Sequence, residues 1–197
     1  MKTFVLIVLS MCVILPAAAY PVVMPNQVNA LIGAKNRGSQ MDSFNNLRQI
    51  GQAITMYLAA NDDNLPKDFS DLASFAGSSR IFVSAADKVS KPASGNDIKP
   101  GNTSFAYIGN LGRADALRNA AATPVAFEKP WLLPPSQRFA AVLYADGHVD
   151  RVQLPAQGGK SCQTVVKLLT AKLNDKALTA KLMKNAKAED AARKKSR

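Results

Sequence analysis

The chain has 197 residues, of which 47% are hydrophobic, and its formal net charge is +11. This length and apolar content suffice for one folded domain with its own core, and they exclude a wholly disordered chain. The charge is uneven, because residues 160–197 hold 11 basic and 3 acidic side chains whereas residues 20–159 hold 13 and 11. Only the C-terminal part is strongly basic, so the composition does not indicate a nucleic-acid-binding protein.

The N-terminus has the pattern of an export signal. Lys2 precedes an apolar run over 4–15, and three alanines follow, which predicts cleavage between Ala19 and Tyr20. The run is shorter than the roughly 20 apolar residues that a membrane-spanning helix needs. We therefore expect an exported protein, periplasmic or secreted, with an inner-membrane anchor only if the segment is kept.

A helix is predicted in the next part of the chain. Residues 20–40 are rich in proline and glycine and read as a linker with at most a short helix over 27–35. Asp42 or Ser43 then caps a longer helix. Its apolar positions recur at three- and four-residue steps and predict one buried face: Phe44, Leu47, Ile50, Ile54, and Tyr57 or Leu58. The run 61–66, Asn-Asp-Asp-Asn-Leu-Pro, ends this helix.

Short strands follow the helix. The β-branched and aromatic segments predict them at 80–83, 104–108 and 125–127, and a hairpin over 139–154 supplies two more. The polar segment 84–103 predicts a long exposed loop. Short connections favour antiparallel pairing, so we expect an α+β fold with the helix packed on one face of the sheet and the other face partly wet.

The hairpin turn carries the chain's one histidine. Asp146 and Gly147 suit the central positions of a type I′ turn, which would set Tyr144 opposite Val149. Asp146, His148 and Asp150 are the candidate metal ligands, but no second histidine or cysteine completes a zinc site. The sequence favours a structural turn without metal, and it implies no cofactor.

The C-terminal segment 156–197 predicts a basic amphipathic helix, an appendage that frays after Ala186. Five of its lysines are candidates for contact with an anionic lipid, polymer or acidic partner, although a solvated face is the commoner explanation for such a pattern: Lys167, Lys172, Lys176, Lys181 and Lys184. Cleavage of the signal would leave Cys162 as the only thiol, which excludes an internal disulfide. We expect Cys162 to be a partly buried residue at the start of a helix.

Several of these segments together resemble a known family. The segments 45–53, 80–88, 104–109, 123–130 and 146–149, in this order, are similar to bacterial type II secretion pseudopilins and prepilin-type proteins. The resemblance covers about residues 41–155, which would be a pilin-like head between the linker and the basic tail. It implies a long N-terminal helix that carries a small antiparallel sheet and assembles with other pilin-like subunits or secretion-system proteins, without catalysis.

The chain departs from that family at four positions. Thr3 stands in place of the glycine that the prepilin peptidase reads, and Val8 in place of a glutamate that positions an incoming subunit. Ser136 and Ser84 stand where a related subfamily has a histidine and, nearby, a cysteine. The processing and assembly that the resemblance implies are thus open to test.

No enzyme motif is present in the sequence. A catalytic triad would have to use His148, no Gly-x-Ser-x-Gly elbow occurs, and the segment 158–161 lacks the first glycine of a phosphate-binding loop. We therefore expect a non-enzymatic, pseudopilin-like structural or assembly component. The alternative is a soluble periplasmic binding module whose basic C-terminal helix contacts an anionic partner or membrane surface.

Overall fold

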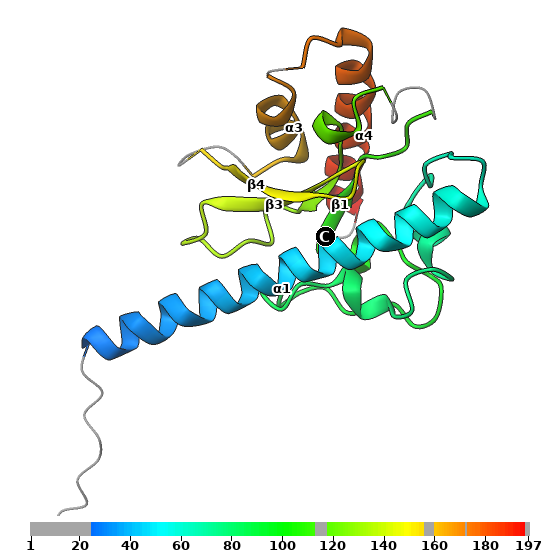
Figure 1. Ribbon diagram of the computed structural model, residues 1–197. Helices are drawn as coiled ribbons and strands as arrows, with labels where there is room; N and C mark the ends of the chain where they lie inside the picture. Colours follow the sequence, from blue (N-terminus) through cyan, green and yellow to red (C-terminus); the bar gives the residue numbers. More distant parts are fainter. Residues whose placement is uncertain (1–24, 113–117, 156–159, 172, 196–197) are drawn as a thin grey trace, which may run out of the picture.

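The computed structural model describes residues 25–112, 118–155, 160–171 and 173–195 (Figure 1). A long N-terminal helix is followed by a four-stranded sheet and two C-terminal helices. The helices and strands are α1 (Pro25–Ala60), β1 (Phe105–Tyr107), β2 (Pro124–Glu128), β3 (Phe139–Tyr144), β4 (Val149–Gln153), α3 (Cys162–Thr170) and α4 (Lys176–Lys195). Within these ranges, short 3-10 helices lie in the connections at Phe69–Leu72, Ser79–Phe82, Pro100–Asn102 and Ala120–Ala122.

The sheet has the order β1-β2-β3-β4, and every neighbouring pair is antiparallel. The predicted α+β class, with a helix packed on a small antiparallel sheet, is confirmed. The strands predicted near 104–108, 125–127 and 139–154 are all present.

Helix α1 is longer than predicted, because it runs without interruption from Pro25. The predictions of a linker over 20–40 and of a cap at Asp42 or Ser43 are wrong for the residues from 25 onward. Proline is well tolerated in the first turn of a helix, and an interior glycine costs only about 1 kcal/mol, so Gly33 and Gly38 do not end it. In Figure 1 the blue, N-terminal half of α1 projects beyond the sheet.

The second half of α1 packs on the sheet through the predicted face, where Leu47, Ile50 and Ile54 are buried. A side chain at Gly51 would place its Cβ 3.0 Å from Cδ1 of Leu143, so glycine permits the helix to approach β3 closely. The helix ends as predicted after Ala60, where Asp62 and Asp63 take left-handed backbone angles.

The segment predicted as a strand at 80–83 is wrong, since Ser79–Phe82 forms a 3-10 helix. The Ser78 hydroxyl accepts a hydrogen bond from the Arg80 amide, and Ser79 donates one to the Ala93 carbonyl. Phe82 is nevertheless buried and contacts Phe69, with ring centroids 5.0 Å apart and ring planes tilted by 52°. The apolar residues of this segment serve the core, but in a different backbone conformation.

The C-terminal part also differs from the prediction. Two helices replace the single one, and α4 does not fray after Ala186 but continues to Lys195. Leu178, Leu182 and Ala186 are buried in the same core as Leu47 of α1. In Figure 1, α3 and α4 lie on the side of the sheet opposite α1. Both faces are therefore covered, which corrects the expectation of a partly wet face and of a swinging appendage.

Candidate functional site

The β3–β4 hairpin is present, but its turn is not the predicted type I′. Only Gly147 has a positive φ, +89°, and Asp146 does not. The Gly147 amide donates to the Tyr144 carbonyl, the Tyr144 amide donates to the His148 carbonyl, and Val149 pairs with Leu143. The loop thus has three residues and ends in a left-handed glycine, a common hairpin form. The predicted pairing of Tyr144 with Val149 is wrong.

Instead of pairing with Val149, Tyr144 stacks on His148. Their ring centroids are 4.3 Å apart and their planes differ by 5°. The Nδ1 atom of His148 lies 2.6 Å from Oδ1 of Asp146. Burial alone would raise the pKa of Asp146, but hydrogen bonds from the backbone and ring of His148 hold that pKa below its ordinary value.

The third candidate ligand, Asp150, lines a cavity of about 420 Å³ together with Tyr144 and His148. Within the described ranges, no group of three or more histidine, cysteine, aspartate or glutamate side chains is placed to hold a metal ion. The hairpin brings Asp146 and His148 together as a hydrogen-bonded pair that stabilises the turn.

The turn leads to a stability prediction at Gly147. We expect Gly147→Val to lower the free energy of unfolding by about 1–2 kcal/mol, because a β-branched residue is strained at positive φ. No atom of a neighbouring residue lies within 4 Å of an added Cβ, so the cost comes from the strained backbone angle and not from a clash with the surroundings. Thermal and urea unfolding would measure it. Gly101→Val is the matched control, since Gly101 is exposed, equally open and not left-handed; an equal loss in both variants would contradict the assignment.

Four of the candidate lysines lie in the described helices. Lys167 on α3 and Lys176, Lys181 and Lys184 on α4 are exposed. Lys172 and the predicted cleavage site, Ala19 and Tyr20, lie outside the described residues. The lysine face is present, and the opposite face of α4 is buried against the sheet and α3.

Cys162 is fully buried as the first residue of α3. Its expected position at the start of a helix is confirmed, and its burial is complete where partial burial was expected. Burial, with the charges of Asp190 and Glu189, raises the pKa of the thiol, so it stays protonated and unreactive. Asp190 also accepts a hydrogen bond from the Cys162 amide at 2.8 Å, which holds α3 and α4 together.

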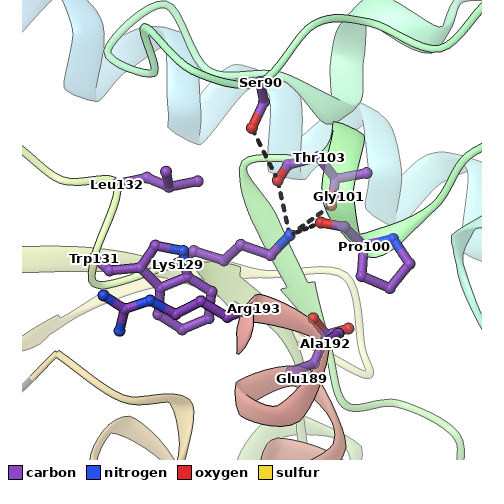
Figure 2. Close-up of a pocket in the computed structure, with 10 residues that line it drawn as sticks. All are labelled: Ser90, Pro100, Gly101, Thr103, Lys129, Trp131, Leu132, Glu189, Ala192 and Arg193. Atoms are coloured by element: carbon purple, nitrogen blue, oxygen red, sulfur yellow. Dashed lines mark hydrogen bonds between the residues drawn. The ribbon is translucent and has the colours of Figure 1, made fainter. Parts of the chain in front are cut away.

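A small cavity of about 50 Å³ lies between β2, the loop before β1 and α4, and the sequence did not reveal it (Figure 2). Its central residue, Lys129, is only 3% exposed. The ammonium group donates to the carbonyls of Pro100 and Thr103 and to the Thr103 hydroxyl. The loop over 84–103, predicted to be exposed, thus supplies buried acceptors to the end of the sheet.

Glu189 of α4 faces the same cavity from the other side (Figure 2). Its Oε1 accepts a long hydrogen bond, 3.4 Å, from the Tyr107 amide, and its Oε2 is buried without a hydrogen-bond partner among the described residues. Burial raises the pKa of Glu189 and lowers that of Lys129, while their mutual attraction opposes both shifts. The arrangement joins α4 to the sheet electrostatically.

A larger groove, of about 400 Å³, runs between α1 and the β3–β4 hairpin. The residues that line it are Arg37, Gln40, Met41, Phe44, Arg48, Gln137, Phe139, Ala141 and Arg151. We call it the arginine groove. Arg37, Met41, Phe44 and Arg48 recur at steps of four, three and four residues along α1, but Arg37 fell in the segment 20–40 that was read as a linker.

Among the described residues, no helix has the length and apolar character to cross a bilayer. Compared with known proteins, the chain matches no family model, and no curated protein or solved structure shows significant similarity to it.

Proposed function

We propose that this protein is a non-enzymatic, pilin-like subunit, a structural or assembly component of a type II secretion or related fibre system. The observation that supports the proposal is the fold: a helix of 36 residues whose second half packs on an antiparallel sheet and whose first half projects from it. The exposed sides of the projecting half can pack against helices of neighbouring subunits, and a fibre that assembles through its helices requires such packing. The motif order described above supports the same proposal.

The mature N-terminus distinguishes this proposal from its alternative. Protein from the native host would be examined by intact mass and N-terminal sequencing, and sheared cell-surface material by electron microscopy. If the proposal is right, the chain keeps its apolar N-terminal segment and starts at Met1 or, methylated, at Phe4, and the cleavage that the signal pattern predicts between Ala19 and Tyr20 does not occur. A start at Tyr20 would mean ordinary export, and it would contradict a membrane-derived fibre subunit.

The second candidate function is an exported binding module that uses the lysines of α3 and α4. The exposure of Lys167, Lys176 and Lys184 favours it. Deleting the tail would be a poor test, because α4 is part of the core. A triple lysine-to-glutamine variant should instead lose salt-sensitive binding to phosphatidylglycerol vesicles, while the triple arginine variant keeps it. Equal binding by the unchanged protein, the glutamine variant and the arginine variant would refute this function.

A further inference from the structure

The arginine groove has an unusual charge balance. Arg37, Arg48 and Arg151 are all exposed, and no acidic side chain lines the groove. None of the three guanidinium groups has a carboxylate partner among the described residues. The acid behind the groove is Glu128, which is 2% exposed and whose Oε2 already accepts from the Ala141 amide at 2.8 Å. Three positive charges thus line one groove, and no carboxylate among the described residues pairs with them.

The composition of the groove is that of a protein interface. The chain has nine arginines and sixteen lysines, yet the groove contains three arginines and no lysine. Arginine, methionine and aromatic residues are enriched where proteins bind each other, and lysine is depleted there. Met41 and Phe139, two of the five exposed large hydrophobic residues in the described ranges, are 59% and 38% exposed and lie in this groove.

The aromatic rings also hold one of the arginines in place. The Arg151 guanidinium lies 5.8 Å from the centre of the Phe44 ring and 6.0 Å from that of Phe139. Such contacts leave the hydrogen-bond donors of the guanidinium free for a planar anion and reduce the entropy lost on binding. Phe44 is partly buried against the core, so this part of the groove is formed before any ligand arrives.

The spacing of the other two arginines sets the length of the ligand. Arg37 and Arg48 lie on one stripe of α1, eleven residues and therefore about 16 Å apart. Met41 and Phe44 lie between them on the same stripe. A matching ligand carries carboxylates at its two ends and apolar side chains between them.

We propose that the arginine groove binds an acidic, amphipathic peptide segment of a partner protein. Its glutamates or aspartates pair with Arg37, Arg48 and Arg151, and its apolar side chains contact Met41 and Phe139. A hollow with aromatic walls and three separated cations fits side chains of a peptide better than the continuous phosphate backbone of a nucleic acid. The inference is independent of the proposed pilin-like function, because it concerns the groove between α1 and the β3–β4 hairpin and would hold for a soluble protein too.

The test uses the full chain and a fluorescein-labelled peptide that carries glutamates at both ends and leucines between them. We expect binding by fluorescence anisotropy at low salt, and Arg48→Gln should weaken it about tenfold, as the loss of a charge-assisted hydrogen bond implies. Phe139→Ala should weaken it as well. Lys67→Gln is the matched control, since it removes the same charge from an exposed position in the loop after α1, outside the groove, and it should leave the affinity nearly unchanged.

Three results would overturn the proposal. One is the absence of measurable binding by the glutamate peptide. Another is equal weakening by Arg48→Gln and Lys67→Gln, or equal affinity for a control peptide with glutamines, since either would show unspecific attraction. The last is Arg48-dependent binding of phosphatidylglycerol vesicles or single-stranded DNA that is tighter than binding of the peptide. That result would assign the groove to a different class of ligand. Unchanged melting temperatures of the variants would confirm that they are folded.

Discussion

Replacing Leu182 by alanine is expected to lower the free energy of unfolding by about 2–5 kcal/mol, the usual cost of removing a large buried side chain. Leu182 is fully buried on α4, within the core that also contains Leu47 of α1. Urea denaturation followed by circular dichroism would measure the loss. Lys184→Ala is the matched control on the exposed face of the same helix, and it should change stability by no more than about 0.5 kcal/mol.

The result distinguishes a core helix from an appendage. If α4 were a tail that swings free of the head, Leu182→Ala would leave the unfolding of the head unchanged. Polar contacts give the same expectation as the apolar ones: the Asn185 side chain donates to the carbonyls of Ile108 and Asn110, and Asp190 accepts from the first turn of α3. We therefore expect removal of residues 176–197 to prevent stable folding of the whole domain.

The sequence predicted the parts of the fold that depend on local patterns. Periodicity identified the buried face of α1, and short apolar runs identified β1, β2 and the hairpin. It failed where tertiary contacts decide between alternatives. The residues at 80–83 favour a strand by propensity, yet the Ser78 cap and the contact with Ala93 select a 3-10 helix. Asp-Gly suits more than one turn, so the sequence located the hairpin without fixing its register.

The cavity around Lys129 could not be predicted, because a buried lysine is recognised only by its partners. Pro100 and Thr103 precede it by more than 25 residues, and Glu189 follows it by 60 along the chain. The basic composition of α4 also gave no sign that the helix packs in the core, because lysine-rich segments are usually solvated. Here the lysines cover one face, and Leu178, Leu182, Ala186 and Glu189 form the other.

The pseudopilin resemblance and the binding roles of the lysines remain predictions. The structure shows that the two halves of α1 differ in burial. The second half packs in the core through Leu47 and Ile50, whereas Arg37 and Met41 in the first half are exposed. The first half is therefore the part of the helix that can contact another molecule without unfolding the head.

Replacing Lys129 by methionine should destabilise the protein by about 3–5 kcal/mol at neutral pH, as removal of one member of a buried charged group does. Methionine keeps the volume and the apolar stem of the side chain, so the loss is electrostatic. It leaves the carbonyls of Pro100 and Thr103 without their donor and Glu189 without the positive charge that attracts it. Thermal and urea unfolding across a pH series would measure the effect.

The pH dependence identifies the cause. Burial already raises the pKa of Glu189 above its ordinary value of 4.5, and loss of Lys129 raises it further. An acid whose pKa is higher in the folded than in the unfolded state contributes stability that is fully present below the unfolded value and is lost as pH rises through the folded value. Lys129→Met should therefore be less destabilising near pH 4.5 than at pH 7. Adding Glu189→Gln should recover part of the stability and remove this pH dependence, whereas an equal deficit at both pH values would mean that the orphaned carbonyls, and not Glu189, account for the loss.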